Sequence, residues 1–411
     1  MRAGYGLSTP QTQPVGSLVS YFRFVAANAP FLGFGLLLAC FSSFGQTFYI
    51  GLFGASIRAE FGLSHAGFGS LYMAGTLASG AAFAFAGRAI DRIALRRYAA
   101  FALAGLAGAC ALMATAANSI LLTAALCGLR FFGQGLVTHT AHTATARHFE
   151  GDRGKALSIV MLGHPLGEAL LPPIAVAAAA WLGWREVWWA ASALLVFAIL
   201  PAAMLLLPGM PAPARSASSR SGAWSMLFRD RRFLLALPAV LVPAFVSTGF
   251  AFHIVPLAAE RSWDMKLVAA AFSAFAIVKV ATSLAMGPAI DRFSARVLLP
   301  ALLLPLIAAC LTLSAGEATW IAFLFMAFLG ASGGVTQTLL GAIWAEVYGT
   351  GHLGAIRSVY FVLMVFSSAL APAAFGRAID AGAGLAEIGL ACAAVMAGAK
   401  LLLLAGGLNR R

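Results

Sequence analysis

The sequence of 411 residues contains little charge, since Asp, Glu, Lys and Arg together make up only 10% of it. Soluble domains carry roughly 25% charged residues, so this chain lacks the side chains that cover a water-exposed surface. Hydrophobic residues make up 61%, and the mean hydropathy is +0.90. Apolar windows of about 20 residues, the length that crosses a bilayer as a helix, follow one another with few gaps. We therefore expect a protein that lies in a lipid bilayer.

Features of several other protein classes are missing. The five cysteines all fall inside apolar segments, which argues against a disulfide framework. The sequence has no Gly-x-x-x-x-Gly-Lys-Ser/Thr loop, so we expect no nucleotide cofactor. The net charge of +13 is spread over the ends of apolar segments, and we expect no nucleic-acid partner.

Two short patterns suggest chemistry but fit structural roles better. His139-x-x-His142 has no carboxylate or cysteine nearby to complete a metal site, so we expect no metal. Gly330-Ala-Ser332-Gly-Gly334 matches the Gly-x-Ser-x-Gly nucleophile elbow, which requires a preceding strand. Here the pattern lies in an apolar helical segment, where small residues let helices pack closely. We therefore do not expect an enzyme.

Twelve apolar segments are predicted to span the membrane. They lie at residues 28–53, 66–86, 98–117, 119–145, 155–180, 187–207, 233–258, 266–288, 297–315, 320–345, 355–376 and 385–406. The segment 208–232 is rich in Pro, Ser, Ala and Arg, and we interpret it as a cytoplasmic linker. It separates an N-terminal half, 28–207, from a C-terminal half, 233–411, which ends in a short cytoplasmic tail. Residues 1–27 show no signal-peptide cleavage pattern and are expected to form a cytoplasmic N-terminal tail.

The distribution of positive charge predicts the orientation. With the N-terminus inside, 19 of the 27 Lys and Arg residues fall on the cytoplasmic side and five on the outer side. Cytoplasmic loops carry an excess of Lys and Arg, so both termini are predicted to be cytoplasmic. We expect a multi-pass protein of a bacterial inner membrane, acting as a monomer.

An internal repeat relates the two halves at an offset of 200 residues. The sequence GRAIDR at 87–92 corresponds to GPAIDR at 287–292. The same offset pairs Arg96 with Arg296, Cys110 with Cys310, Gly133 with Gly333, Gly154 with Gly354, Ser158 with Ser358 and Pro172 with Pro372. Two parallel repeats of six helices are one known transporter architecture. The prediction is an all-α membrane protein of two pseudo-symmetric six-helix halves.

On these residues the chain resembles the major facilitator superfamily over nearly its whole length. The family's loop after the second helix reads Gly-x-x-x-Asp-Arg-x-Gly-Arg-Arg. The corresponding residues here are Gly87, Asp91, Arg92, Arg96 and Arg97, and in the second half Gly287, Asp291, Arg292 and Arg296. The family's pattern Leu-x-x-x-Arg-x-x-x-Gly in the fourth helix is met by Leu126 and Arg130, with Gln134 and its flanking glycines shifted by one position. A basic residue in the eighth helix is also similar to monocarboxylate and oxalate/formate carriers.

The repeated loops suggest a cytoplasmic gate. A carboxylate such as Asp91 or Asp291 can accept backbone N–H groups at a helix N-terminus. A bond of this kind across the two halves would hold the cytoplasmic side shut. The arginines fit equally well as positive-inside anchors. We assign this gate to Gly87, Asp91, Arg92, Gly287, Asp291 and Arg292.

Three charges inside spans have no counterpart at the 200-residue offset: Arg130, Glu168 and Lys279. Intramembrane charges are costly unless paired or hydrated, so each is a functional candidate. Counting residues from the outer helix ends places Arg130 beside Glu168, with Gln134 and His164 one turn deeper. This predicts an Arg130–Glu168 ion pair, which serves either structure alone or transport. His164 is either an ordinary core histidine or a proton carrier.

Lys279 is left without an intramembrane acid by this pairing. It therefore either points into a wet cavity or packs uncharged between helices. Together the three charges leave the cavity with one net positive charge, which favours an anionic substrate of the carboxylate type. Gln46 and Tyr49 in the first span are further candidates to line the site.

The predicted function is that of a secondary transporter that moves a small, anionic solute by alternating access. A proton or counter-substrate gradient would supply the energy. One alternative is a proton-coupled exporter of amphiphilic drugs or metabolites. A membrane sensor on a transporter scaffold is another, but the chain has no large polar segment for an output domain.

Overall fold

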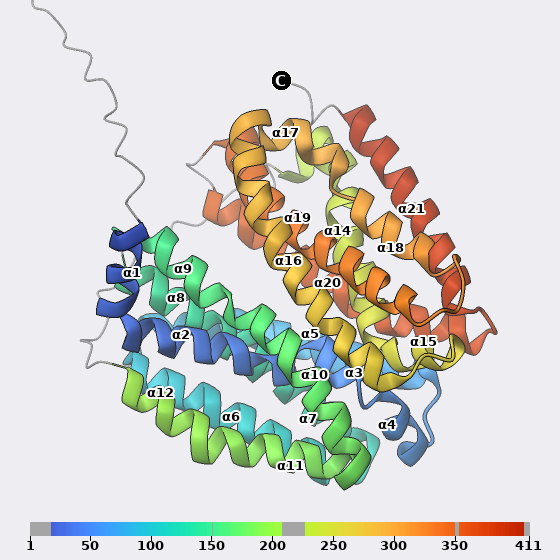
Figure 1. The fold of residues 1–411 in the computed structure, drawn as a ribbon, viewed down its shortest axis with the longest axis horizontal. Helices are drawn as coiled ribbons and strands as arrows, with labels where there is room; N and C mark the ends of the chain where they lie inside the picture. The colour runs from blue at the N-terminus through green and yellow to red at the C-terminus, as the bar shows by residue number, and fades with distance from the viewer. Residues whose placement is uncertain (1–17, 150, 208–226, 350–352, 407–411) are drawn as a thin grey trace, which may run out of the picture.

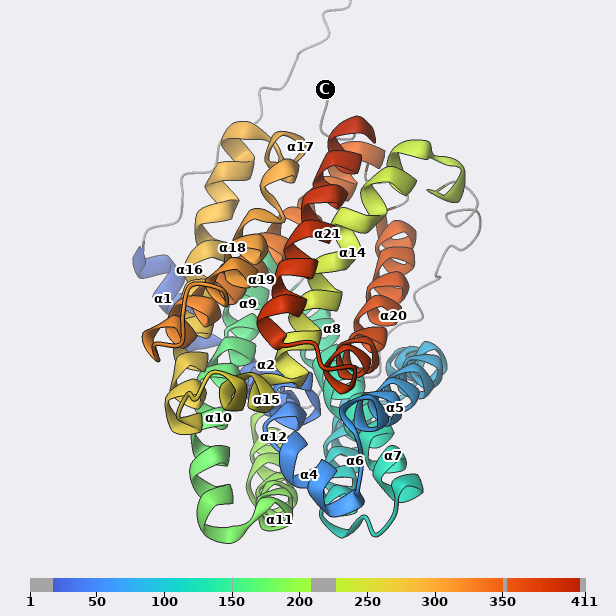
Figure 2. The same ribbon diagram turned by 90° about the vertical axis from the view of Figure 1, so that its right-hand side faces the viewer.

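The computed structural model describes residues 18–149, 151–207, 227–349 and 353–406. Within these ranges, twelve helices are long and apolar enough to cross a bilayer, which confirms the predicted fold class. The two halves form separate six-helix bundles, seen in blue to green and in yellow to red in Figures 1 and 2. The twelve spans correspond one to one with the twelve predicted segments.

The helices of the N-terminal half are as follows. They are α1 (Leu18–Ala27), α2 (Ala29–Phe41), η1 (Ser42–Gly45), α3 (Thr47–Gly51), α4 (Gly54–Phe61), α5 (His65–Ala86), η2 (Gly87–Asp91), α6 (Leu95–Thr115), α7 (Ser119–Gly128), η3 (Leu129–Val137), α8 (Thr138–His148), α9 (Arg153–Met161), α10 (Gly163–Leu182), α11 (Trp184–Leu194), η4 (Leu195–Ile199) and α12 (Leu200–Leu206).

The helices of the C-terminal half are longer and less interrupted. They are α14 (Arg231–Phe252), α15 (Ile254–Glu260), α16 (Met265–Phe293), α17 (Ala295–Leu298), η5 (Leu299–Ala301), α18 (Leu304–Thr312), α19 (Trp320–Tyr348), α20 (Leu353–Asp380) and α21 (Leu385–Gly406).

The structure adds detail to the predicted boundaries. Part of the segment predicted as an N-terminal tail forms helix α1. The repeated loop at Gly87–Asp91 is a 3₁₀ turn that continues α5, so the second span is longer than expected. Most of the predicted linker, 208–226, lies outside the described residues. The proposed division at 208–232 therefore stays a prediction.

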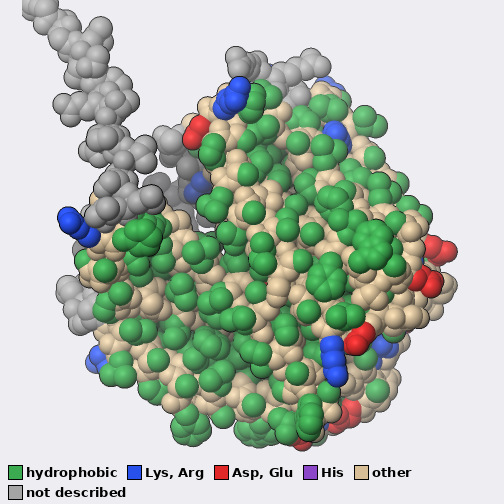
Figure 3. Space-filling view, viewed as in Figure 1, with side chains coloured by type: hydrophobic (Ala, Val, Ile, Leu, Met, Phe, Trp, Pro, Cys, Tyr) green, Lys and Arg blue, Asp and Glu red, His purple; other side chains and the backbone are tan. Residues whose placement is uncertain are grey.

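The surface of the spanning helices is apolar, as a lipid-facing surface requires. Figure 3 shows a face on which hydrophobic side chains predominate and the few charged ones lie mostly toward the edges. Large apolar side chains are widely exposed in both halves, among them Trp181, Phe197, Leu205, Ile277 and Leu284. Contiguous apolar surface of this extent on a water-soluble monomer would be unusual. The fold and the surface together place the chain in a membrane.

The internal repeat is visible in tertiary contacts as well as in sequence. Glu60 accepts hydrogen bonds from the side chains of Arg185, at 2.6 Å, and Trp184, at 2.9 Å. The hydrogen bond from Arg185 holds the pKa of Glu60 below its usual range. In the second half, 200 residues on, Glu260 accepts the backbone N–H of Leu385 at 2.6 Å. Equivalent positions thus meet in both halves, through different atoms.

The two halves meet at one end of the molecule, which we name the far end. It contains the turns at 62–64, 116–118, 183, 261–264, 313–319 and 381–384. The opposite end, named the basic end, contains the repeated 87–92 and 287–292 segments and most of the Arg and Lys residues. Figure 1 shows the helices of the two halves converging around α3, α4 and α15 and diverging toward α1 and α17.

Glycines allow direct backbone contact between the halves toward the far end. A Cβ atom on Gly51 would overlap the carbonyl oxygen of Ala251, and one on Gly69 would overlap that of Pro372. Aromatic rings fill the space beside these contacts. Phe68 and Phe252 stack with their centroids 4.7 Å apart. Backbone contact and aromatic packing together close this part of the molecule to solvent.

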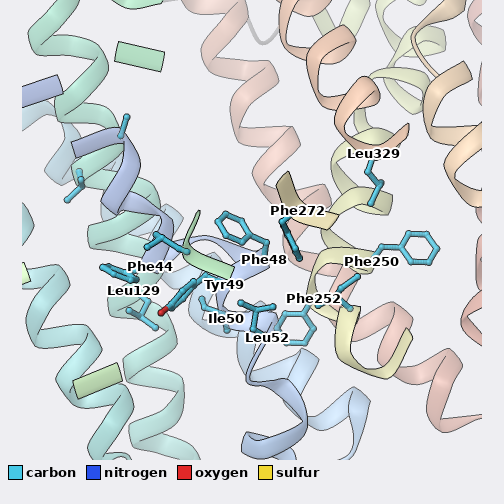
Figure 4. Packing of buried hydrophobic residues seen from close by; sticks show 14 of the residues in the cluster. Phe44, Phe48, Tyr49, Ile50, Leu52, Leu129, Phe250, Phe252, Phe272 and Leu329 are labelled. Atoms are coloured by element: carbon cyan, nitrogen blue, oxygen red, sulfur yellow. The ribbon is translucent and has the colours of Figure 1, made fainter. Parts of the chain in front are cut away.

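Phe48 and Phe272 extend the aromatic packing between the halves toward mid-height. Their ring centroids are 5.7 Å apart, and Figure 4 shows the two rings facing one another from α3 and α16. Tyr72 adds a third ring against Phe252, at 4.7 Å. Such tilted and edge-to-face pairs stabilise by about 0.5–1.5 kcal/mol beyond the area they bury. The interface is therefore specific as well as apolar.

A carboxylate joins the halves at the far end through a helix N-terminus. Asp380, the last residue of α20, accepts the backbone N–H groups of His65 at 3.0 Å and Ala66 at 2.8 Å. These are the first residues of α5, whose N–H groups have no partner within the helix. This arrangement was predicted for Asp91 at the basic end, and the structure shows it for a different acid at the far end.

In the described part of the chain, the first-half and second-half residues assigned to the cytoplasmic gate form no ion pair with one another. Asp91 forms an ion pair with Arg147 of its own half. Asp291, Arg92 and Arg292 are exposed. The halves diverge toward the basic end, and within the described residues no hydrogen bond or ion pair joins Asp91 to the other half. A cross-link through Asp91 would belong to a state with a closed basic end, and it stays a prediction.

The Asp380 cross-link gives the first test. Asp380→Ala should favour opening of the far end, because an exposed N-terminal cap is worth about 0.5–1 kcal/mol, or up to about a fivefold change in population. Spin labels at Ala59 and Lys266, one in each half and both exposed, would report the change on a background without native cysteines. We expect a larger population of long distances in the variant.

Glu260→Ala is the matched control, because Glu260 caps α21 within one half. It should lower the thermal stability without changing the distance distribution. Equal distributions in wild type and Asp380→Ala would show that the cap does not hold the far end closed.

Candidate functional site

The first spanning helix is broken near its middle. It was predicted to be continuous over 28–53, but after the 3₁₀ turn η1 the residue Gln46 is extended, with ψ at 151°. The helix resumes as α3. Gly45 lies so close to the fourth span that a Cβ atom on it would overlap Leu129 O and lie 2.7 Å from the Cα of Gly133. The break leaves backbone groups near Gly45 free to bond elsewhere.

The fourth span is irregular at the same depth. Residues Leu129–Val137 form a π-helix, in which each turn contains about one residue more than in an α-helix. Gln134 and its flanking glycines lie in this segment, and they are the residues shifted by one position from the family pattern. The π-helix accommodates that shift. Irregular backbone at membrane depth is tolerated where it is covered by protein or lines a cavity.

Arg130 connects the two irregular segments. Its Nη1 donates to the carbonyl oxygen of Gly45 at 3.2 Å and to the hydroxyl of Thr47 at 3.4 Å. The guanidinium also lies over the ring of Tyr72, 5.3 Å from the centroid. The side chain is only 4% exposed, and its Nε has no hydrogen-bond partner in the described residues. Within the described chain, no carboxylate forms an ion pair with Arg130.

The predicted Arg130–Glu168 pair is wrong, and so is the prediction that Lys279 lacks an acid. Lys279 Nζ donates to both carboxylate oxygens of Glu168, at 2.7 and 2.9 Å. Both side chains are mostly buried, 17% and 13% exposed. Glu168 is on α10 and Lys279 on α16, so the ion pair joins the two halves.

The first spanning helix explains why the sequence-based pairing failed. It packs against the fourth spanning helix on one side and against the fifth spanning helix on another. A Cβ on Gly167 of α10 would lie 2.6 Å from the carbonyl oxygen of Cys40, just as Gly45 lies against Gly133. Arg130 therefore contacts the backbone of the first spanning helix and does not reach the fifth. Glu168 turns instead to α16 in the other half. Counting residues from the helix ends predicted how deep each side chain lies in the membrane, but not which helices are neighbours.

Small residues on α19 bring α16, and with it Lys279, into place. A Cβ on Gly334 would lie 2.5 Å from the carbonyl oxygen of Lys279, and one on Gly330 would overlap that of Phe275. The stem of Lys279 runs past Gly333, whose Cβ would be 3.6 Å from Lys279 Cδ. The Gly330–Gly334 pattern thus serves helix packing, as predicted.

Two histidines lie on the wall of the site toward the basic end. His142 Nε2 on α8 and His164 Nε2 on α10 are 3.3 Å apart, which is within hydrogen-bond distance when one of them carries a proton. His139 is one turn away and lies 3.3 Å from the hydroxyl of Thr143. No group of three or more metal-ligating side chains was found in the described residues.

These residues line one cavity of about 870 Å³ between the halves. Six of the predicted site residues are among its lining: Gln46, Arg130, Gln134, His164, Glu168 and Lys279. Arg130, Glu168 and Lys279 are its charged lining residues in the described chain, apart from histidines, so the predicted net charge of one positive is retained. Toward the basic end the lining includes His139, His142 and Ser158, which were not assigned to the site.

Tyr49 is the one predicted substrate-binding residue outside this cavity. It is 3% exposed, and its ring packs edge-on against Trp188 at 5.3 Å and Phe44 at 5.1 Å. Because the helix is broken at Gln46, the residues after the break turn a different face to the cavity from the one a continuous helix would present. Phe48, rather than Tyr49, faces the cavity.

The cross-half ion pair gives the second test. Glu168→Gln should lower the stability of the purified protein by about 3 kcal/mol, because it leaves the ammonium of Lys279 buried and unpaired. Glu168→Gln combined with Lys279→Met should recover most of that loss, since no unpaired charge remains. Thermal unfolding in detergent would compare Glu168→Gln, Lys279→Met and the double variant with the wild type.

Arg130→Gln combined with Glu168→Gln provides the contrast. These two side chains do not touch, so their effects on stability should add rather than cancel. Additive losses for the Glu168 and Lys279 changes would contradict the ion pair seen in the structure.

The close approach of α16 and α19 gives the third test. Gly334→Ala should cost about 1–3 kcal/mol, because the new methyl group meets the backbone of α16. Gly333→Ala is the matched control and should be neutral or slightly stabilising, because its methyl group makes ordinary contacts with Lys279 and alanine favours helix. Equal melting temperatures for the two variants would show that α16 moves away at little cost.

Sequence comparison identifies the family. A profile of the Major Facilitator Superfamily matches residues 35–372, which is most of the chain. No curated protein matches the sequence.

Solved structures share the fold at low sequence identity. A mutant of the nucleoside transporter NupG has a TM-score of 0.76 and 15% identity, covering 91% of this chain and 99% of its own. A bacterial homologue of the human lysosomal transporter Spinster, inward-facing and occupied, has a TM-score of 0.65 and 17% identity, covering 95% and 94%. The same homologue, inward-facing and unoccupied, has a TM-score of 0.62 and 16% identity, covering 93% and 94%. At these identities the likeness shows the fold alone.

Proposed function

The chain belongs to the major facilitator superfamily of transporters, and from that premise we propose that it carries a small anionic solute by alternating access. The observation that supports this best is the cavity of about 870 Å³ between the halves, in which Arg130 is buried without an acidic partner in the described chain. A solute carboxylate would supply the missing partner. The chain would act as a monomer, since one copy builds the whole cavity.

Alternating access requires a central site that is closed toward one side of the membrane. Backbone contacts, aromatic packing and the Asp380 cap join the halves at the far end. The cavity extends from mid-height toward the basic end, where the halves diverge (Figure 1). We place the basic end in the cytoplasm, because cytoplasmic loops carry the excess of Lys and Arg. The state described here is then inward-facing.

Arg130, rather than Lys279, is the better anchor for an anion. The carboxylate of Glu168 already satisfies Lys279 at two short distances. Arg130 has only a carbonyl oxygen, a hydroxyl and a tyrosine ring as neighbours that accept from it or stabilise its charge. A guanidinium can bind a carboxylate through two parallel hydrogen bonds. Since Glu168 and Lys279 neutralise one another, the net positive charge of the cavity resides on Arg130.

Proton coupling is a natural use for the remaining polar groups. Protonation of Glu168 would release Lys279 and break the one ion pair that joins α10 to α16 in the described chain. His142 and His164 lie in the same cavity with their Nε2 atoms 3.3 Å apart, and imidazole nitrogens can accept and donate a proton. A proton that enters the cavity would therefore change how the halves are held together.

Two further expectations belong to the same proposal. An all-helical chain fits the cytoplasmic membrane of a bacterium, because outer-membrane spanning proteins are β-barrels. Export of amphiphilic solutes is the second candidate function, and the apolar side chains Phe83, Met161, Leu162 and Phe361 on the cavity wall favour it. A carrier for neutral or cationic amphiphiles would not need Arg130 for binding.

Binding of carboxylates to purified protein gives the fourth test. A panel of small carboxylates, with neutral amides of the same shape, would be screened by thermal shift, since a ligand that binds the folded state raises its apparent stability. We expect stabilisation by an acid and not by its amide. Arg130→Gln should weaken binding at least about tenfold, in line with the loss of a charge-assisted hydrogen bond.

Two variants make this test specific to Arg130. Arg130→Lys keeps the charge and should retain part of the affinity if the variant melts like the wild type. The double variant Glu168→Gln with Lys279→Met leaves the net charge unchanged and should still bind. Binding of amides as strong as that of acids would favour the amphiphile exporter.

A further inference from the structure

A second chamber adjoins the main cavity and extends past Phe48 into the C-terminal half. Its volume is about 240 Å³. The two spaces share Gln46, Phe48, Arg130 and Gln134 as lining residues, so Arg130 lies at the junction. A solute held by Arg130 therefore has room for a second group in this chamber.

Aromatic side chains form much of the chamber wall. Phe272 and Phe275 of α16 line it together with Phe48 of α3, and Phe250 of α14 adds a fourth ring. Figure 4 shows Phe48, Phe272 and Phe250. Phe48 and Phe272 are 5.7 Å apart at their centroids, and Phe272 and Phe275 are 6.4 Å apart. These spacings are within the range of interacting rings, and a planar ring bound among them would make edge and face contacts with several at once.

The polar lining residues of the chamber are Gln46, Thr47, Arg130, Gln134, Ser247, Thr248 and Ser368. Arg130 is its one charged lining residue in the described part of the chain. Ser247 and Thr248 lie on α14 of the C-terminal half and offer hydroxyl groups to a bound ligand. Binding sites of this kind are mostly apolar, with a small number of polar groups that fix the orientation of the ligand.

The charge pattern excludes several classes of ligand. A cation would be repelled by Arg130, and a zwitterion would leave its ammonium without an acid, because Glu168 lies outside the chamber lining and is held by Lys279. A short aliphatic acid would satisfy Arg130 but leave the aromatic chamber unfilled. A neutral aromatic molecule such as a nucleoside would fill the chamber but leave Arg130 without an anion.

We propose that the chamber is the recognition subsite for an aromatic monocarboxylate. The carboxylate contacts Arg130 at the junction, and the ring lies among Phe48, Phe272 and Phe275. A hydroxyl or other polar group on the ring reaches Ser247 or Thr248. This inference rests on the proposed function, in which an anion binds at Arg130, and it adds the chemical class of the solute.

The test compares probes that differ in one property. Benzoate, cyclohexanecarboxylate, acetate, benzamide and uridine would be titrated into the full-length wild-type protein by calorimetry or thermal shift. We expect benzoate to bind about 2- to 10-fold more tightly than cyclohexanecarboxylate, the fold-change that corresponds to an aromatic pair. Acetate should bind more weakly than either acid with a ring, and benzamide and uridine should bind weakest.

A chamber-filling substitution locates the ring. Ala244 lines the second chamber and not the main cavity, so Ala244→Leu should weaken benzoate at least about tenfold and leave acetate unchanged. Val280→Leu is the matched control, because Val280 lines only the main cavity, and its affinity for benzoate should equal that of the wild type. Thr248→Val, which keeps the shape of the side chain, should weaken 4-hydroxybenzoate more than benzoate.

The outcomes separate this inference from the proposed function. If acids bind through Arg130 but benzoate has no advantage, or Ala244→Leu behaves like Val280→Leu, the aromatic subsite is wrong and the anion carrier stands. If no carboxylate binds the wild type, both fail. If uridine binds more tightly than benzoate, the chamber recognises neutral aromatic solutes and the inference is overturned. Unchanged melting of the unliganded variants would show that they fold.

Discussion

The close contact between Gly45 in the first span and Gly133 in the fourth determines much of the site. No side chain fits between these backbones, so two irregular segments, the broken helix at Gln46 and the π-helix of η3, face one another directly. The break exposes the carbonyl oxygen of Gly45, and Arg130 binds it. A charged residue at membrane depth needs such partners. The position of the guanidinium therefore follows from a backbone contact rather than from an opposing acid.

The second constraint is the ion pair between Glu168 and Lys279, which crosses from one half to the other. Within one bundle such a pair would be part of the scaffold. Between two bundles, it links the charge of the cavity to the contact between the halves. A conformational change can only be driven by an interaction that differs between the two states. This pair and the Asp380 cap are two interactions that join the halves in the structure.

The repeat accounts for the scaffold and not for the site. Glu60 and Glu260 hold equivalent corners of the two bundles, although one accepts from side chains and the other from a helix N-terminus. Arg130, Glu168 and Lys279 are replaced at the 200-residue offset by Gly330, Ser368 and Ser79. The charges of the cavity are thus the part of the molecule in which the halves have diverged. Because each of these charges occurs in one half only, the cavity is asymmetric although the fold is pseudo-symmetric.

The sequence by itself determined the class, the twelve spans, the two halves and part of the cavity lining. Three signals made these predictions possible: the length of the apolar segments, the positive charge at helix ends, and the 200-residue offset between the repeats. Each can be read along the chain without knowing how the helices pack. Six of seven predicted substrate-binding residues do line the cavity, because an unpaired polar residue in a span must face something other than lipid.

Only the tertiary structure decided which of these residues meet. The depth of a residue in the membrane can be counted along its helix, but the order in which helices lie side by side cannot be counted. The first spanning helix lies between Arg130 and Glu168. The break at Gln46 has no proline to mark it, and it turned Tyr49 away from the cavity and Phe48 toward it. The helix cap between the halves was expected at Asp91 and occurs at Asp380. Which end of the molecule is closed depends on how the two bundles are placed relative to one another. The hydrophobic pattern of the helices within either bundle does not specify that placement.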